Sequence, residues 1–320
     1  MTALDVFLQQ IVNGLSNGMI IALIAIGYTL VYGIVELINF AHGDLVMLGS
    51  FVALTCVGMF ALSDPSLTGG SFVVLLALVF IIAALSCGAL NWAIDVLFYR
   101  PIRNSPRLTQ LVTAIGISFV FLNIGLFWGG LPMEVFGGGA AAAAPKDFPA
   151  LISYSNLLGE SEVQISMRDL MVFVVTIPLM IALTLLIKYT RWGTSMRAVA
   201  QNPTAAQLMG IDVNWVIGTT FFVGGALGGI ASVVYALYNN TIYFQMGYRI
   251  GMDGFTAAVL GGIGHLPGAV LGGLVIGVIR AFSDQYIATR WTNVVVFAIL
   301  ILVLVFRPGG LLMAKAKEKV

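Results

Sequence analysis

About eight long apolar segments, separated by short polar stretches, constrain the fold of this sequence most. A helix needs about 20 apolar residues to cross the hydrocarbon core of a bilayer. Hydrophobic residues are 59% and charged residues 9% of the chain, against roughly 45–50% and 25% in soluble domains. We therefore predict an all-α polytopic membrane protein that forms one transmembrane domain over residues 1–320. The predicted segments are Val6–Val35, Phe40–Leu62, Phe72–Phe98, Leu108–Trp128, Leu170–Ile187, Val216–Tyr238, Gly254–Phe282 and Asn293–Phe306.

Basic residues predict which connections lie in the cytoplasm, because cytoplasmic loops carry the excess of Lys and Arg. Residues 99–108 and 188–197 are basic, and so is the C-terminus with Lys315, Lys317 and Lys319. Two spans separate the first two of these stretches, so the connection at about residues 129–169 is expected outside. Its GGGAAAAAP run at residues 137–145 suggests a flexible external loop. Counting spans backwards then places the N-terminus outside and the C-terminus in the cytoplasm.

The seventh segment is interrupted by GGIGHLPG at Gly261–Gly268. Proline and clustered glycines stop a helix. Backbone that is not helical is tolerated at membrane depth only where protein or a wet cavity covers it. We therefore expect Gly254–Ile263 and Pro267–Phe282 to be two half-helices of a re-entrant hairpin. A single span with a severe break is the alternative.

A second interruption is INFAHGDL at residues 38–45, where Asn39, His42 and Asp44 stand between apolar runs. Polar groups at membrane depth are costly and usually face a bundle interior or a cavity. The three residues are therefore candidates for a substrate path. The alternative is a cytoplasmic turn in which Asp44 caps a helix over Leu45–Thr55.

A polar, basic loop at about residues 190–213 lies between two apolar segments. Ala198–Met209 is predicted to form a short helix, with Pro203 near its first turn and Gly210 as its C-terminal glycine cap. Because the loop lies outside the bilayer, this helix is suited to receive force from a partner protein.

Small residues recur at helical spacing in four runs, which predicts close approach of neighbouring helices. The runs are Gly14–Gly18, Gly225–Gly229, Gly268–Gly272 and Gly273–Gly277. Asn91 and Asn123 are isolated polar residues on spans, for which hydrogen bonds between helices are expected.

Several motifs are missing from the sequence. It has no GxxxxGK[ST] phosphate loop, GxSxG, HExxH or CxxC motif, and no TVGYG-type filter. His42 and His265 are the two histidines, and no spacing of further ligands suggests a metal site. The net charge of +1 gives no case for nucleic acid. We expect a protein that is not an enzyme and binds no cofactor or metal of its own.

Four runs of sequence, together with FRPGGLL near the C-terminus, resemble the branched-chain amino acid ABC transporter permeases, specifically the H-type subunit. They are GYTLVYGIVELINFAHGDLVMLGSF, YRPIRNSPRLTQLVTAIGIS, GTSMRAVAQNPTAAQLMGID and GFTAAVLGGIGHLPGAVLGGLVIG. The resemblance implies a type II ABC importer-like permease in a bacterial or archaeal plasma membrane. It also implies a second, M-type permease subunit, two cytoplasmic ATPases that hydrolyse ATP, and an external substrate-binding protein.

The same resemblance implies that the loop over Thr194–Asp212 is the coupling helix that docks on the ATPase. The residues expected to serve this contact are Thr194, Arg197, Gln201, Asn202, Pro203, Ala205, Ala206, Gly210 and Asp212.

Three other functions remain open from the sequence. Permeases for urea or short amides look similar. An ion-coupled secondary transporter also uses broken helices, but it needs carboxylates deep in its spans, and only Glu36, Asp44 and Asp95 come near that description. An intramembrane enzyme using His42 or Asp44 is the third.

Overall fold

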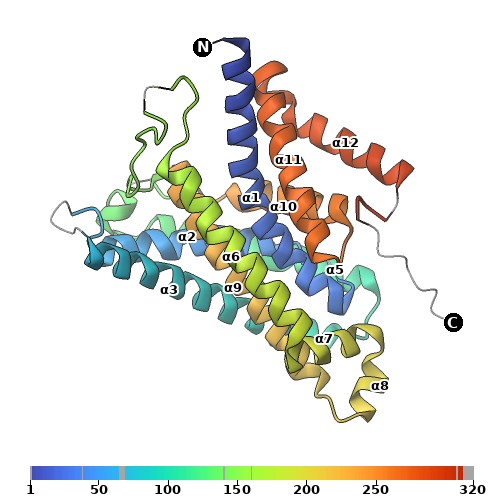
Figure 1. The fold of residues 1–320 in the computed structure, drawn as a ribbon. Coiled ribbons are helices and arrows are strands. Elements are labelled where there is room, and N and C mark those ends of the chain that lie inside the picture. The colour runs from blue at the N-terminus through green and yellow to red at the C-terminus, as the bar shows by residue number, and fades with distance from the viewer. Residues whose placement is uncertain are drawn as a thin grey trace.

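The structure is a computed structural model that describes residues 2–37, 39–64, 69–139, 141–159, 161–307 and 309–312. Helices dominate it, which confirms the all-α class (Figure 1). The described helices are α1 (Ala3–Val35), α2 (Ala41–Met59), α3 (Gly70–Ile94), α4 (Arg100–Ile102), α5 (Arg107–Gly129), α6 (Met167–Tyr189), α7 (Arg191–Gln201), α8 (Pro203–Leu208), α9 (Val213–Asn239), α10 (Met246–Gly261), α11 (Leu266–Tyr286) and α12 (Thr292–Phe306). Short strands β1 (Lys146–Asp147) and β2 (Thr241–Ile242) pair antiparallel. The C-terminal lysines lie outside the described residues.

Eight helices in the described ranges are long and apolar enough to cross a membrane. They are α1, α2, α3 with its π-helical continuation to Ile102, α5, α6, α9, α11, and α12 with the turn before it. Each falls on one of the predicted segments. The seventh segment differs, because it contains two helices and only α11 has the length to cross.

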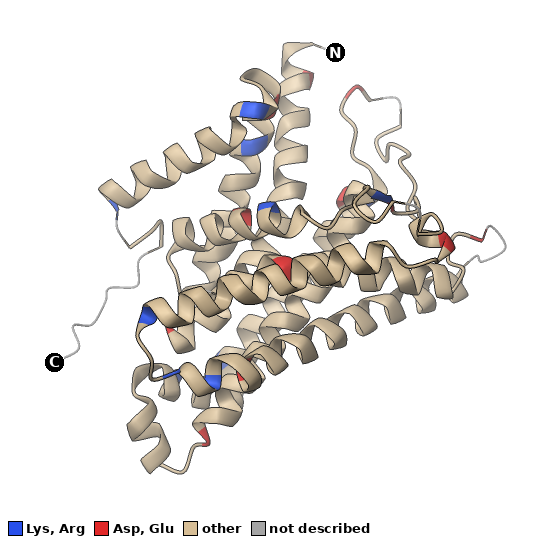
Figure 2. Cartoon of the chain, turned by 180° about the vertical axis from the view of Figure 1, so that it is seen from behind, with Lys and Arg blue, Asp and Glu red and all other residues tan. Residues whose placement is uncertain are grey.

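Helices α1, α2 and α9 form the centre of the bundle, and most of their residues are buried. Helices α3, α5, α6 and α12 surround them and expose large apolar side chains such as Phe119, Val174 and Val305. Figure 2 shows that long stretches of the helices carry no charged residue. Such a surface suits lipid or another membrane subunit.

Glycines allow the central helices to touch backbone to backbone. A Cβ at Gly18 of α1 would lie 2.8 Å from the Cα of Leu274 in α11. A Cβ at Gly225 of α9 would lie 2.5 Å from the carbonyl oxygen of Cys87 in α3. No side chain fits in these places, so the predicted close packing at the glycine runs is confirmed.

The two polar residues on spans behave differently. Asn91 of α3 donates to the carbonyl of Phe221 in α9 at 2.6 Å, as expected for a bond between helices. Asn123 donates to the carbonyl of Phe119 in its own helix α5, so the expectation for it was wrong. Its side chain is exposed on the outer face of α5, and its hydrogen bond goes to a carbonyl one turn earlier in the same helix.

Helices α10 and α11 form an antiparallel hairpin. Gly261 contacts Gly268, and Ala257 contacts Gly272. The turn between them uses Gly262 and Gly264 at φ 103° and 87°, where other residues would be strained. The predicted break is thus confirmed, and its two halves lie side by side rather than end to end. The predicted limits were wrong, because α10 begins at Met246 and α11 continues to Tyr286.

Four helix ends meet at one end of the bundle, here called the loop end. Gln9 near the start of α1 accepts from the amide of Gln164 at 2.7 Å, just before α6. Arg168 at the start of α6 donates to the carbonyl of Tyr238 at the end of α9 at 3.0 Å. Gln10 donates to Gln285 at the end of α11 at 3.3 Å. Helices α7 and α8 project from the opposite end, here called the coupling end (Figure 1).

The segment at residues 129–166 lies at the loop end and has defined contacts. Lys146 donates to the carbonyls of Phe136 and Ala141 at 3.0 and 2.7 Å. The amide of Phe148 donates to the carbonyl of Asn240 at 2.9 Å, beside the β1–β2 pair. Residues 140 and 160 are not among the residues that the structure describes, and flexibility of the GGGAAAAAP run stays a prediction.

Candidate functional site

The polar stretch at residues 38–45 turns the chain from α1 into α2, but the structure separates its polar side chains. Helix α1 ends at Val35, Glu36 takes a left-handed conformation with φ 53°, and α2 begins at Ala41. Ile38 lies outside the described residues. The three predicted path residues, Asn39, His42 and Asp44, therefore do not form one site.

Asn39 is held by hydrogen bonds to other residues of the bundle. Its amide donates to the side-chain oxygen of Asn91 at 3.2 Å, and its own oxygen accepts from the hydroxyl of Tyr99 at 3.1 Å. The same oxygen accepts from the amide of Ala41 at 3.2 Å, at the start of α2. Asn39 thus serves the start of α2, the role predicted for Asp44, and it ties α2 to α3.

His42 is packed between helices. Its ring meets Tyr28 edge-on, with centroids 4.7 Å apart. A Cβ at Gly27 of α1 would lie 2.5 Å from its Nε2, and one at Gly228 of α9 would lie 3.2 Å from its Cε1. Nε2 has no hydrogen-bond partner in the described part of the chain. His42 lines neither of the two cavities described below.

Asp44 stands apart from the other two. It lies inside α2, and the hydroxyl of Ser118 in α5 donates to its Oδ2. Its Oδ1 is buried and has no partner among the described residues. No side-chain cap of α2 involves it, so the predicted capping role was wrong. A buried acidic oxygen without a partner is costly, and within a membrane such groups mark functional sites.

A cavity of about 800 Å³ lies beside Asp44, between α1, α2, α5 and α10. Its walls are mostly apolar, and Asp44, Ser118, Tyr28 and Gln245 supply polar groups. It is lined by Tyr28, Phe40, Asp44, Leu111, Ile115, Ser118, Phe119, Leu122, Tyr243, Gln245, Gly247, Tyr248, Gly251 and Met252. Few polar groups in an apolar cavity of this size are typical of a small-molecule site. Phe119 and Tyr248 are exposed, so the cavity opens on the outer face of the bundle.

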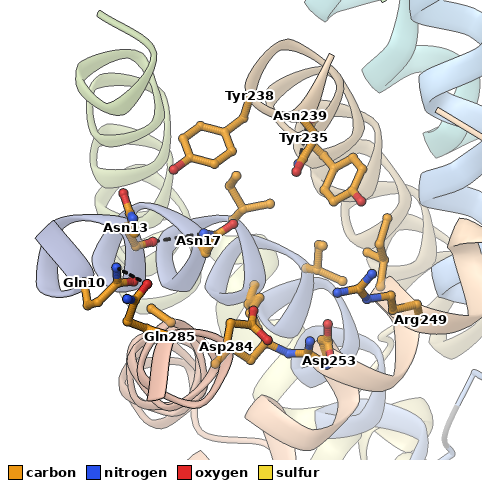
Figure 3. A pocket seen from close by; sticks show the side chains of 16 residues that line it. Gln10, Asn13, Asn17, Tyr235, Tyr238, Asn239, Arg249, Asp253, Asp284 and Gln285 are labelled. Atoms are coloured by element: carbon orange, nitrogen blue, oxygen red, sulfur yellow. Dashed lines mark hydrogen bonds and ion pairs between the residues drawn. The ribbon is translucent and has the colours of Figure 1, made fainter. Parts of the chain in front are cut away.

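A second cavity, of about 570 Å³, lies at the loop end between α1, α9, α10 and α11, and it is polar (Figure 3). Its lining residues are Gln10, Asn13, Asn17, Ile20, Ile21, Ile24, Tyr235, Tyr238, Asn239, Arg249, Ile250, Asp253, Arg280, Ala281, Asp284 and Gln285. None of these residues was predicted from the sequence as part of a site. The available signal was an Arg followed four residues later by an Asp, which occurs twice in a chain poor in charge, at Arg249 and at Arg280.

Helix α10 separates the two cavities. Ile250 and Asp253 face the polar cavity, whereas Gly247 and Gly251 face the cavity at Asp44. Gly247 also presses against Asp44, because a Cβ there would collide with the Asp44 carboxyl group. A shift of α10 would therefore change both cavities.

At the coupling end the predicted single helix is two helices. Asn202 ends α7 and caps α8, since its side chain accepts from the amide of Ala205 at 3.0 Å. Pro203 occupies the first turn of α8, and Gly210 follows it at φ 82°, as predicted. The error arose at Asn202, whose extended backbone interrupts the helix.

Several residues predicted to meet the ATPase have local roles. Arg197 donates to the carbonyl of Ile187 and to Thr194, which holds α7 against the end of α6. Asp212 caps α9 through the amide of Trp215. Ala206, also in the predicted set, is buried with 4% of its surface exposed. Gln201, Asn202, Pro203, Ala205 and Gly210 are exposed, and their contact with an ATPase stays a prediction.

Two large apolar side chains at this end were not among the residues predicted to meet the ATPase. Leu208 and Met209 are 84% and 82% exposed at the end of α8, away from the membrane-spanning helices. Exposed apolar groups outside the bilayer favour a protein partner.

Comparison with known proteins decides the family. The model of the family described as "branched-chain amino acid transport system / permease component" matches residues 10–304. The chain belongs to this family. The predicted resemblance is thereby confirmed, and the chain is a multi-pass permease component.

Relatives within the family cover nearly the whole chain. The "high-affinity branched-chain amino acid transport system permease protein LivH" of Escherichia coli K12 is 40% identical over 317 residues, 98% of each chain. LivH of Salmonella typhimurium is 39% identical and BraD of Pseudomonas aeruginosa 38%, with the same coverage. A probable permease named LivM from Methanocaldococcus jannaschii is 28% identical over 140 residues, 39% of this chain and 41% of its own. No solved structure matches.

Proposed function

We propose that this permease component imports branched-chain amino acids as one of two permease subunits driven by partner ATPases. The names of the LivH and BraD relatives support the substrate class, and the partial similarity to LivM supports a second, related permease. ATP is hydrolysed by two cytoplasmic ATPases, and an external binding protein delivers the substrate. The complex lies in the plasma membrane of a bacterium or archaeon. Helices α7 and α8 and the C-terminus lie in the cytoplasm; the loop end and the N-terminus lie outside.

The observation that carries the proposal is the unpartnered oxygen of Asp44 beside an apolar cavity. A branched-chain amino acid has an ammonium group and an aliphatic side chain. Asp44 can accept from the ammonium group, while Phe40, Leu111 and Ile115 pack against the aliphatic part. The cavity opens on the outer face, so a second permease subunit packed there would complete its wall. A path needs only weak binding, so that the cargo can leave.

The alternatives fit the same site less well. Urea and short amides are neutral and small, and they would leave the acidic group and the long apolar walls unused. Of the three carboxylates considered for an ion-coupled carrier, Asp95 pairs with Arg103 at 3.0 Å and Glu36 pairs with Arg107 at 3.5 Å, which leaves Asp44 alone for an ion. The family match also favours a permease of an ATP-driven system over both this carrier and an enzyme.

Coupling to the ATPase is assigned to α8. Leu208 and Met209 form an apolar tip that a groove on an ATPase can cover. Arg197 bonds α7 to the end of α6. A push on α8 would thus reach α6 through α7.

The test is transport by the complete complex. The chain, its second permease, the ATPases and the binding protein are reconstituted in liposomes, with uptake of leucine, urea and acetamide compared. Leucine uptake that requires ATP and exceeds uptake of both amides is expected. Uptake that proceeds without ATP on an ion gradient, or that favours the amides, contradicts the proposal.

A further inference from the structure

Charge is concentrated in the polar cavity at the loop end. The whole chain has 15 Lys or Arg and 14 Asp or Glu. Two of each, Arg249, Arg280, Asp253 and Asp284, line this one cavity. The chain has few charged residues, so exposure to water alone does not explain why four of them line one cavity.

Two of these four charges hold the wall together. Arg280 of α11 pairs with Asp253 of α10, and it also donates to Asn293 at 2.8 Å. The side chains of Arg280 and Asp253 are 11% and 15% exposed. This pair fixes α10 against α11 and neutralises both charges without a ligand, while the buried Nε of Arg280 has no partner among the described residues.

The other two charges are opposite in sign and not paired with each other. Arg249 of α10 is exposed and makes no hydrogen bond or ion pair within the described ranges. Asp284 of α11 accepts from the hydroxyl of Thr292 but forms no ion pair with a described residue. Figure 3 shows them on either side of Asp253, at the border of the same cavity. The cavity therefore offers one cation and one anion for an outside ligand.

The rest of the lining matches a small amphipathic molecule. Asn13, Asn17 and Tyr235 bring neutral polar groups, and Ile20, Ile24 and Ile250 form an apolar part. We propose that this cavity is a second binding site, which takes the zwitterionic main chain of a free α-amino acid. The carboxylate of the ligand lies at Arg249 and its ammonium group at Asp284, in charge-assisted contacts. The inference rests on the proposed function for its substrate class.

The position of the cavity gives the site a place in transport. It lies at the loop end, and α10 has residues on the walls of both this cavity and the cavity at Asp44. An amino acid bound here would lie on the other side of α10 from the cavity at Asp44. Movement of the hairpin would then open the way to Asp44.

Binding to the assembled complex in nanodiscs tests the site, without ATP and without the binding protein. The probes are L-leucine, L-leucinamide, which lacks the carboxylate, and 4-methylpentanoate, which lacks the ammonium group. Ligand-observed NMR measures their affinities. Arg249→Gln and Asp284→Asn are compared with Arg290→Gln and Asp147→Asn, which change exposed residues outside the cavity.

We expect leucine to bind more tightly than either analogue. Arg249→Gln should weaken the binding of leucine about tenfold, because a hydrogen bond to a charged group is lost. In this variant leucine should bind no more tightly than leucinamide. Asp284→Asn should abolish the advantage over 4-methylpentanoate. The two control variants should bind like the unmodified complex. Equal binding of all three probes, or an unchanged preference in both cavity variants, overturns the proposal.

A second measurement does not depend on the charged variants. A cysteine at Asn17, on the cavity wall, is modified by a water-soluble thiol reagent; the native Cys56 and Cys87 are buried. Leucine should slow this modification, and leucinamide should not. Protection by the binding protein alone would overturn the amino-acid site in favour of a docking surface. Leucine uptake is recorded in parallel: if leucine does not protect the cysteine although leucine uptake is intact, this inference fails and the proposed function stands.

Discussion

The three polar residues of the INFAHGDL stretch have different tasks, although they lie within six positions of the chain. Asn39 is hydrogen-bonded on all sides, His42 is packed among glycines, and Asp44 alone reaches a cavity. The sequence predicts that polar groups at an interruption matter, because their burial is costly. It does not predict their directions, which depend on where α3, α5 and α10 pack.

At Asn39 we predict a loss of stability rather than of transport. Asn39→Ala removes bonds to Asn91, Tyr99 and the start of α2, and should cost about 1–3 kcal/mol, because buried partners lose their hydrogen bonds. Thermal unfolding in detergent measures this, with Asn123→Ala as a matched control on an exposed helix face. Uptake divided by the amount of folded complex should stay near normal. An unchanged melting temperature with reduced uptake would instead place Asn39 on the path.

Single helices were predictable to a large extent, and the exceptions have local causes. Long apolar runs predicted every span, and Pro203, Gly210 and the GGIGHLPG run marked real boundaries. The start of α10 was missed because MGYRIGMD carries charge, which in sequence resembles a loop. In the structure α10 begins at Met246 and not at Gly254. Its charged residues Arg249 and Asp253 face the polar cavity, so they are compatible with a helix at this position.

The α10–α11 hairpin predicts that its two ends lie on the same side of the membrane. Single cysteines at Tyr248 and Gln285, in a background without other cysteines, should both react with an impermeant reagent added from outside. The reason is the antiparallel contact of Gly261 with Gly268 and of Ala257 with Gly272. If one site reacts only from the cytoplasmic side, the segment crosses the membrane and the proposed position of the N-terminus changes.

The tip of α8 predicts where the ATPase binds. Leu208→Glu should reduce co-purification of the ATPase at least fivefold, because a charge replaces an exposed apolar contact worth roughly 1–3 kcal/mol. Leu158→Glu, an equally drastic change on an exposed residue at the loop end, is the control and should have no effect. Normal ATPase recovery with Leu208→Glu would remove α8 from the docking surface.

At the scale of the whole molecule, the arrangement of helices could not be derived from the sequence. Most of α2, and most of α1 after Gly14, is buried in protein, so no continuous exposed polar face indicates the neighbours of these helices. The glycine runs predicted close contacts but not the partners, which prove to be α11 for α1 and α3 for α9. Both cavities, and the position of α10 between them, follow from these pairings.

The central claim is that Asp44 contacts the transported amino acid, and ATP-dependent leucine uptake by Asp44→Asn complexes tests it most directly. Asparagine keeps the size of the side chain and can still bond to Ser118, while the acidic group is lost. Uptake per folded complex should fall at least about tenfold, the loss expected for one charged hydrogen bond. ATPase co-purification and the control variant Asp147→Asn should be unaffected. Leucine uptake at the normal rate in Asp44→Asn complexes would contradict the claim and leave Asp44 a structural residue.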